Sequence, residues 1–318
     1  MWGARFGSVA LAAAVMLTCG CDVRVEGEAT LPAPDLCAAL PAEVVQTIYG
    51  QTNSPLFVSK RVDDDPFHAG GMASCHYGGP SALGGISLGI PLGKPVKDIA
   101  ELVGGTYDAT GADIRIDTDK AYVLLNGPTK AIAVQHGETQ FVISWDSLMW
   151  AEKKTITKEQ LIALATEVVK NLPRNYVTPP REIPAECPDA ATMAVVGPVT
   201  NARGTAAKEA LYCDYAGRDG IIQMSAVRED SDLIERRIEH LRGPSESDVV
   251  APPIAPDAAL TAFGTTQLRS EGFLSKCCSI RITSHVPGTT KRTGGLSPLE
   301  RAATTNFIDA ARRWAGSK

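Results

Sequence analysis

Hydrophobic residues are spaced along this 318-residue chain so that both halves predict one order of elements: a helix, two strands, a helix, several strands and a closing helix. In the first half, apolar residues at helical spacing between Val44 and Tyr49 predict a short helix, which Gly50 ends. The later elements of this half are expected at 73–77 and 86–90 (strands), 96–103 (helix), 114–116, 122–125, 131–135 and 140–145 (strands) and 157–172 (helix). The Gly-rich stretch 78–93 fits a hairpin better than a phosphate-binding loop.

The second half repeats this order after a proline-rich linker. Its elements are expected at 189–196 (helix), 211–215 and 221–227 (strands), 231–241 (helix), 260–263, 266–269 and 273–282 (strands) and 297–314 (helix). Capping boxes mark the start of the last helix of each half, Thr157 with Gln160 and Ser297 with Glu300. We therefore expect an α+β fold of two related units, each an antiparallel sheet with helices packed on one face.

The N-terminal segment has the pattern of a targeting sequence. One charged residue, Arg5, precedes the apolar run Val9–Leu17, which is too short to span a bilayer. The run ends near Cys19 and Cys21, an arrangement that resembles the lipobox of bacterial lipoproteins. Cys21 follows the small residue Gly20 and is the expected site of acylation, with an ordinary secretory signal as the alternative.

These features divide the chain into a signal peptide (1–20), a flexible spacer (21–36), a first α+β unit (37–173), a linker (174–186) and a second α+β unit (187–318). The net charge is −5 and the chain has no basic run, which argues against nucleic acid as a partner. The same charge argues against adhesion to anionic lipid, so attachment to the membrane is expected through the N-terminal lipid anchor. No cofactor is expected.

A short motif occurs once in each half, as Ser74-Cys75-His76-Tyr77 and as Tyr212-Cys213-Asp214-Tyr215. An isolated cysteine precedes each copy, at Cys37 and at Cys187. The number of cysteines beyond the anchor is even, which indicates disulfide bonds in an oxidising compartment. If each half is self-contained, the isolated cysteine pairs with the cysteine of the motif, which predicts Cys37–Cys75 and Cys187–Cys213.

The adjacent residues Cys277 and Cys278 leave the pairing of the second half open. In the expected strand their side chains point to opposite faces, so a bond between them requires a distorted turn. In the alternative scheme, Cys187 and Cys213 each bond to one member of the adjacent pair.

A lipobox, a short spacer with proline, the segment Asp35–Pro41 leading into an apolar helix, and a Cys-x-aromatic strand follow one another in the chain. Together they resemble a domain of unknown function that is common in actinobacterial envelope lipoproteins, over residues 31–170 and more faintly over 183–315. The chain departs from that family at Leu36, where proline is usual, and in having a second half. The resemblance implies a location in the envelope and a disulfide bond, and it assigns no activity.

The sequence contains no phosphate-binding loop and no His-Glu-x-x-His. The five histidines are scattered, and His240 with Glu239 fits the solvated side of a helix. The strongest metal hypothesis is the segment 63–76, with the donors Asp63, Asp64, Asp65, His68, Met72 and His76. Gly70 and Gly71 interrupt the helix that would align these donors, so we expect an acidic surface loop and no metal site.

Three tryptophans are candidates for a pocket that holds an acyl chain or a sugar. Trp145 and Trp314 occupy apolar positions of their elements and are expected in the core, whereas Trp150 has charged neighbours. We expect a non-catalytic, lipid-anchored binding or accessory protein on the outer face of the cell membrane. Its partner is an envelope protein, a lipid or a glycan, bound in the groove between the units. The alternatives are an envelope hydrolase with a dispersed catalytic set and a metal-binding lipoprotein that uses residues 63–76.

Overall fold

The computed structural model describes residues 35–49, 56–63, 71–79, 85–103, 111–126, 129–146, 155–242, 256–263, 267–285 and 296–317, with all of their side chains except those of 240–242, 261–263 and 267–269. The residues that lie outside this description include Cys19, Cys21, Asp64, Asp65, His68, Trp150 and the side chain of His240. Residues 33–318 form one compact unit. No described helix is both long and apolar enough to cross a membrane.

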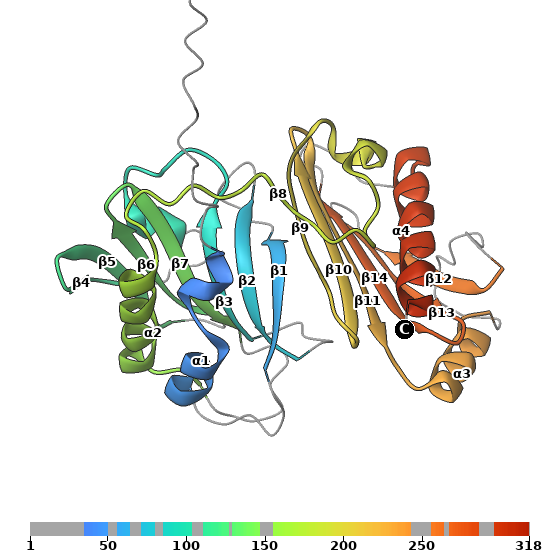
Figure 1. Ribbon diagram of the computed structural model, residues 1–318, viewed down its shortest axis with the longest axis horizontal. Coiled ribbons are helices and arrows are strands. Elements are labelled where there is room, and N and C mark those ends of the chain that lie inside the picture. Colours follow the sequence, from blue (N-terminus) through green and yellow to red (C-terminus); the bar gives the residue numbers. More distant parts are fainter. Residues whose placement is uncertain are drawn as a thin grey trace, which may run out of the picture. The chain divides into compact units, whose positions relative to one another are not determined.

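The described strands form two seven-stranded sheets (Figure 1). The first sheet has the order β1 (Phe57–Asp63), β2 (Met72–Gly78), β3 (Gly85–Pro91), β7 (Thr139–Asp146), β6 (Thr129–His136), β5 (Asp119–Leu124) and β4 (Ala112–Ile116), all antiparallel. The second has the order β12 (Ala258–Phe263), β13 (Gln267–Leu274), β14 (Cys278–His285), β11 (Gly220–Arg228), β10 (Ala210–Gly217), β9 (Val199–Ala206) and β8 (Arg181–Glu182), antiparallel except between β8 and β9. Both sheets and the helices around them agree with the α+β class.

The strand orders correspond when β1, β2 and β3 are set against β9, β10 and β11. The last strand of each half lies next in the sheet, so that β3 pairs with β7 and β11 pairs with β14. Outward from these follow β6 and β5 in the first sheet and β13 and β12 in the second. The two Cys-x-Tyr motifs lie on corresponding strands, β2 and β10. The outer strands differ, because β4 and the two-residue strand β8 have no counterparts.

The described chain has four α-helices, α1 (Ala42–Tyr49), α2 (Lys158–Asn171), α3 (Ser231–Arg242) and α4 (Pro298–Gly316). Both expected capping boxes are present, at Thr157 for α2 and at Ser297 for α4. Two expected helices are replaced by short 3-10 helices, η2 (Ile99–Leu102) in the first half and η3 (Ala190–Thr192) with η4 (Ala194–Val196) in the second.

The described fold begins before the predicted spacer ends. Asp35 caps the 3-10 helix η1 (Leu36–Ala39) by accepting the N–H of Cys37, and Leu36 is fully buried in the core of the first half. The tryptophan predictions agree with the structure, since Trp145 and Trp314 are both buried. Burial of their apolar rings is compatible with the indole N–H groups because each donates a hydrogen bond.

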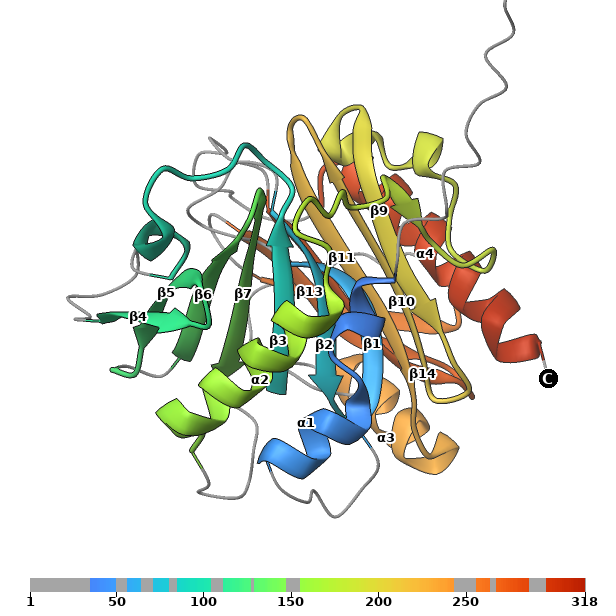
Figure 2. The same cartoon turned by 60° about the vertical axis from the view of Figure 1, so that its left-hand side comes forward.

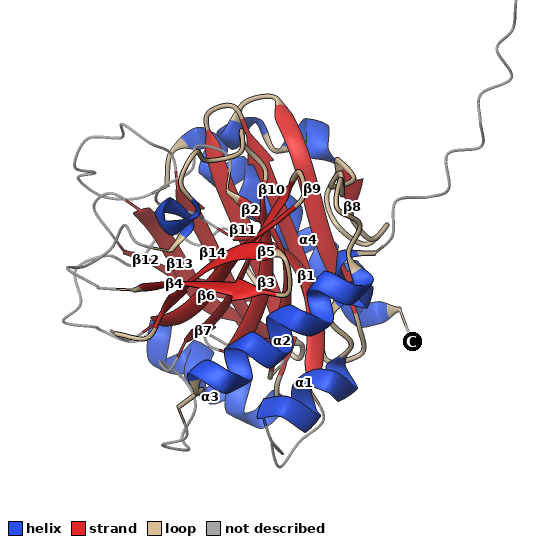
Figure 3. Ribbon diagram, turned by 90° about the vertical axis from the view of Figure 1, so that its left-hand side faces the viewer, coloured by secondary structure: helices blue, strands red, loops and turns tan. Residues whose placement is uncertain are grey.

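Helices cover both faces of each sheet, which corrects the prediction of helices on one face. In the first sheet, α1 and α2 lie side by side (Figure 3) in a core that includes Ile132, whereas η2 packs with the adjacent residue Ala133. In the second sheet, α4 shares a core with Leu260, whereas α3 packs with Ala259 and Phe273. Adjacent residues of a strand point to opposite faces of its sheet. The helices that pack with Ile132 and with Ala133 therefore lie on opposite faces of the first sheet. Those that pack with Leu260 and with Ala259 lie on opposite faces of the second.

Two corresponding strands, β1 and β9, were not predicted, because neither alternates between polar and apolar residues. β1 is the edge strand of the first sheet and lies beside β9 and β10 of the second (Figure 2), with both of its faces at least partly buried. β9 places polar residues, Asn201 and Arg203, at buried positions. A strand whose environment is set by the other sheet lacks the pattern of a half-exposed strand.

Residues 273–282 form a hairpin rather than the single strand that the sequence predicted. β13 ends at Leu274 and β14 begins at Cys278, and Lys276 in the connecting turn has a φ of +57°. The turn brings together Cys277 and Cys278, which are bonded to each other. The structure therefore contains the adjacent pair and not the swapped scheme, because the turn removes the constraint that an extended strand would impose.

Candidate functional site at the junction of the two sheets

The first copy of the Cys-x-Tyr motif fastens the start of the fold to the first sheet. Cys75 on β2 is bonded to Cys37 in η1, as the repeat predicts. Two residues further on, the hydroxyl of Tyr77 donates a hydrogen bond of 3.3 Å to the backbone oxygen of Cys37. Cysteine and tyrosine are both buried on the same face of the strand, so the motif joins one segment by a covalent bond and a hydrogen bond.

The second copy repeats this construction. Cys213 on β10 is bonded to Cys187, and the hydroxyl of Tyr215 donates a hydrogen bond of 2.5 Å to the oxygen of Pro188. Burial raises the pKa of the Tyr215 phenol far above its usual value, and Asp214 adds to the increase. The cysteine and tyrosine of both copies therefore have a structural role.

The middle residue of each copy, His76 or Asp214, points to the other face of its strand. Asp214 is fully buried and accepts hydrogen bonds from the Arg61 side chain, at 2.6 Å from Nε and 3.3 Å from Nη2. It also accepts the backbone N–H groups of Val62 (3.0 Å) and Met224 (3.2 Å). One carboxylate of the second sheet therefore holds both a side chain and the backbone of β1.

Burial has the largest effect on the pKa of each member of this ion pair. It raises the pKa of Asp214, and the charge of Arg61 opposes that shift. Burial has the largest effect on the pKa of Arg61 and would lower it. The charge of Asp214 and its hydrogen bonds with Arg61, with smaller contributions from Tyr212 and Asp63, together outweigh burial, so that the pKa of Arg61 lies above its usual value. The guanidinium also lies 4.4 Å from the centre of the Tyr212 ring, a cation–π contact.

Other side chains of the second sheet satisfy the free edge of β1. The Lys60 N–H donates to Thr205 Oγ1 at 2.8 Å, and the oxygen of Val62 accepts from Gln223 Nε2 at 2.8 Å. Unpaired edge groups would otherwise attract another strand. Together with Asp214, these contacts close the β1 edge.

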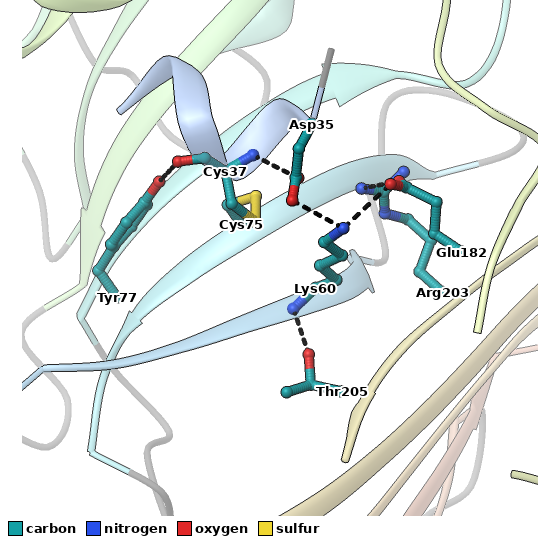
Figure 4. The surroundings of a disulfide bond; sticks show 8 residues. All are labelled: Asp35, Cys37, Lys60, Cys75, Tyr77, Glu182, Arg203 and Thr205. Atoms are coloured by element: carbon teal, nitrogen blue, oxygen red, sulfur yellow. Dashed lines mark hydrogen bonds and ion pairs between the residues drawn. A yellow bond between two sulfur atoms is a disulfide. The ribbon is translucent and has the colours of Figure 1, made fainter. Parts of the chain in front are cut away.

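A chain of ion pairs continues from this edge to the linker (Figure 4). Lys60 Nζ lies 2.9 Å from Asp35 and 3.0 Å from Glu182, and the other oxygen of Glu182 lies 2.6 Å from Arg203 Nη2. Burial lowers the pKa of Lys60, but the two carboxylates outweigh it and the net shift is upward. Two cations and two carboxylates balance, and they connect the start of the fold, β1, β8 and β9.

The described residues do not support the metal hypothesis for segment 63–76. Met72 and His76 lie on the same face of β2 but four positions apart, about 13 Å along a strand, which is too far to share one ion. The remaining donors of the hypothesis, apart from Asp63, lie outside the described residues. Among the residues described, the one compact group of potential ligands is Asp35 with Cys37 and Cys75, whose sulfurs are already bonded to each other.

His136 is the clearest test of the hydrolase alternative, since its Nδ1 lies 2.5 Å from Asp119 Oδ2 in the arrangement of a catalytic base and its orienting acid. Its Nε2, however, lies 3.0 Å from the oxygen of Leu172, and the ring is buried. Arg174 also pairs with Asp119, at 3.0 Å. With both nitrogens engaged, this ring has no free position for a substrate, and its contacts hold the end of α2 against the sheet.

Two serine hydroxyls also reach carboxylates, Ser284 with Glu300 and Ser275 with Glu235. Glu300 belongs to the capping box of α4, and Glu235 also accepts the N–H of Lys276 in the hairpin turn. Neither hydroxyl has a described histidine as a hydrogen-bond partner, so both contacts are structural within the described chain.

Described residues line a pocket at the linker and another at the end of α4. One, of about 360 Å³, lies where the linker meets both sheets and is lined by Ile90, Pro91, Leu92, Gly93, Pro95, Glu138, Thr139, Gln140, Tyr176, Val177, Thr178, Pro180, Thr200 and Asn201. We call it the linker pocket. The other, of about 590 Å³, lies at the end of α4, where Arg228 stacks on Trp314 and donates to the oxygen of Ala315. These contacts of Arg228 satisfy the helix end, a structural role.

No protein-family model and no curated protein matches this chain. The geometry alone therefore bears on its function. It brings together the motif cysteines and tyrosines, which the sequence singled out, and adds Arg61, Asp214 and the linker pocket. The sequence signal that identified Asp214 was its place in the repeated motif, whereas Arg61 carried no signal of its own.

Proposed function

We propose that this chain is a lipid-anchored, extracytoplasmic envelope protein that acts by binding a small ligand in the linker pocket and has no catalytic role. The pocket is the observation that carries the proposal. Its volume of about 360 Å³ falls within the usual range for small-molecule sites, about 300–1,000 Å³. It is lined by β3, the β6–β7 turn, the linker and β9, which matches the expected position of a ligand between two units.

The lining of the pocket favours binding. The lining combines apolar residues, including Pro91, Leu92 and Pro95, with polar residues that carry hydroxyl or amide groups, including Thr178, Thr200 and Asn201. A binding pocket typically combines an apolar lining with a few polar groups that orient the ligand. No lining residue is a cysteine, serine or histidine, so these walls do not offer the Ser–His or Cys–His pair of many hydrolases.

The proposal includes the origin of the fold and its attachment. The corresponding strand orders and the two fastened Cys-x-Tyr motifs support two related units, at 37–173 and 187–318, that arose by duplication. The proposal assigns the chain to the actinobacterial envelope lipoproteins that it resembles, with the signal peptide 1–20 removed and Cys21 acylated.

Native mass spectrometry of the detergent-solubilised protein, purified from its own membranes, tests ligand binding. We expect a retained small molecule that is lost in Val177→Trp, because Val177 is 75% exposed at the rim of the pocket and a larger ring there blocks it. Leu299→Trp is the matched control, an exposed apolar residue that does not line this pocket. Equal retention in both variants would place the ligand elsewhere.

Fractionation of cells tests the anchor. Cys21→Ala should release the protein from the membrane fraction, because two acyl chains are needed for stable anchoring. Cys19→Ala is the control and should stay membrane-bound. Membrane retention of the Cys21 variant would reject acylation at this residue.

A further inference from the structure

The strand β4 leaves the outer edge of the first sheet open. It lies at the opposite end of that sheet from β1, whose edge the second sheet closes (Figure 1). β4 pairs with β5, and within the described residues no other strand pairs with its outer side. Three of its five residues, Ala112, Asp113 and Arg115, are exposed. Such an edge offers unpaired backbone groups to another strand.

The hairpin that joins β4 to β5 determines which backbone groups lie on the open edge. Its two-residue turn, Asp117–Thr118, makes Ile116 and Asp119 the closing hydrogen-bonded pair. Hydrogen-bonded and non-hydrogen-bonded pairs alternate along an antiparallel ladder. The N–H and C=O groups of Asp113 and Arg115 therefore point outward, away from β5.

These two outward residues carry opposite charges, which makes the edge complementary to a second copy of itself. They flank Ile114, so in an antiparallel pairing of two β4 strands centred on that residue, Asp113 of each copy lies opposite Arg115 of the other. Each of these pairs exchanges both backbone hydrogen bonds and adds a cross-strand ion pair. An edge with charges of one sign would instead repel its copy.

The surroundings of the two charges favour this partner. Arg115 lies opposite a like charge, Lys120, and its described polar contact is a hydrogen bond of 3.4 Å from Nη1 to the oxygen of Thr118. Asp113 lies opposite Tyr122, and no described cation pairs with it. A second copy would give Arg115 a carboxylate that offsets the repulsion from Lys120, and would give Asp113 a cation.

The other face of β4 fits the same pairing. Ala112 is exposed, and Ile114 is half-buried against the core of the first half. On the twofold axis the Ile114 residues of the two copies form a non-hydrogen-bonded pair, the kind in which side chains lie closer together. Ala112 of each copy lies opposite Ile116 of the other, so the pairing also buries apolar surface.

We propose that two copies of this chain associate through their β4 edges, antiparallel and centred on Ile114, so that their first sheets become one continuous sheet. This inference goes beyond the proposed binding function and does not depend on it, because no residue of β4 or β5 lines the linker pocket. A strand of five residues gives a small interface, so the dimer is weak and depends on protein concentration.

Analytical ultracentrifugation of the detergent-solubilised full chain, from about 10 µM to about 1 mM, measures the association. We expect monomers at the low end and dimers at the high end. Asp113→Arg and Arg115→Asp each place like charges opposite one another, so each should weaken dimerisation at least about tenfold. They change the net charge in opposite directions, which excludes a general charge effect. Arg218→Asp, at an exposed arginine in the β10–β11 turn, is the matched control and should dimerise like the wild type.

The double variant Asp113→Arg with Arg115→Asp separates charge pairing from damage to the strand. It restores opposite charges across the twofold axis, so we expect it to dimerise like the wild type. A monomeric wild type would leave the edge to a strand of another protein and overturn the proposal. A dimer that persists in both single variants, or a double variant that stays monomeric, would overturn it as well.

Crosslinking in native membranes tests the register. Ile114→Cys should form a disulfide between two copies when treated with the thiol oxidant diamide, because the paired residues on the axis are close. Lys120→Cys, on the neighbouring strand β5, is exposed but lies away from the axis and should not crosslink. Equal crosslinking of the two variants, or none in Ile114→Cys, would reject the pairing centred on Ile114.

Discussion

The two Cys-x-Tyr motifs agree at their outer positions and differ at the middle one. In both, the cysteine and the tyrosine fasten an N-terminal segment to the core of the sheet. At the middle position, Asp214 is fully buried and is fixed by four hydrogen bonds, three of them from β1 of the other sheet, whereas His76 is partly exposed. The repeated positions thus build each half, and the variable position determines how one sheet meets the other.

The largest expected effect is at Asp214. Asp214→Ala leaves Arg61 without its partner and the Val62 N–H unpaired in the interior, which should lower the free energy of unfolding by about 3–5 kcal/mol. His76→Ala, at the matching position, should lower it by less than about 1 kcal/mol because the side chain is partly exposed. Urea unfolding followed by tryptophan fluorescence measures both. Equal losses would remove the contrast between the two motifs.

The disulfide bonds test the agreement between the halves. Replacing both cysteines by alanine at Cys37–Cys75 or at Cys187–Cys213 should cost about 3–4 kcal/mol in each case, since the sequence separations, 38 and 26, differ little on a logarithmic scale. The adjacent pair Cys277–Cys278 closes almost no loop, and its replacement should cost only about 1 kcal/mol. Urea unfolding of the three double variants gives the order. A large loss at the adjacent pair would contradict the loop-length explanation.

The tyrosine hydroxyls provide a finer comparison. Tyr215→Phe and Tyr77→Phe each remove one hydrogen bond to a backbone oxygen without changing the volume of the ring. The expected loss is about 1 kcal/mol for Tyr215, with a donor–acceptor distance of 2.5 Å, and about 0.5 kcal/mol for Tyr77, at 3.3 Å. Thermal unfolding of the two variants under one condition measures the difference. The reverse order would mean that the two bonds are not equivalent parts of a repeated construction.

Periodicity in the sequence predicted the elements whose environment is local. Strands β2, β3, β10 and β11 and helices α2 and α4 follow the predicted positions because each contributes a run of apolar residues to the core of its own half. β1 and β9 were missed because the other sheet buries their polar residues, an arrangement that no local pattern reveals. The hairpin at Lys276 was missed because its αL turn residue is neither glycine nor asparagine.

The sequence predicted only part of the candidate site. Repetition identified Asp214 and the motif cysteines, but it identified none of the residues that line the linker pocket. Arg203 gave no signal, because an arginine in a strand normally indicates an exposed position. Its burial depends on Glu182 from the linker, a partner that only the tertiary structure brings within 2.6 Å.

The smallest expected effect concerns how the two middle residues respond to pH. Burial lowers the pKa of His76 below 6.5, with Asp63 opposing this shift and Arg61 adding to it. Between that lowered value and 6.5 the unfolded chain binds more protons, so His76 reduces the free energy of unfolding as the pH falls from 7 toward 5. In His76→Gln, stability should therefore decline less over this range than in the wild type, as urea midpoints at pH 7.5, 6 and 5 would show.

The contribution of Asp214 to stability changes with pH in the opposite direction. Its raised pKa means that the folded chain binds more protons than the unfolded chain above pH 3.8, so its contribution to the free energy of unfolding increases as the pH falls through the folded-state value. Asp214→Asn should accordingly lose stability relative to the wild type on acidification, and parallel pH profiles for the two variants would contradict the assignment of opposite roles to the two middle residues.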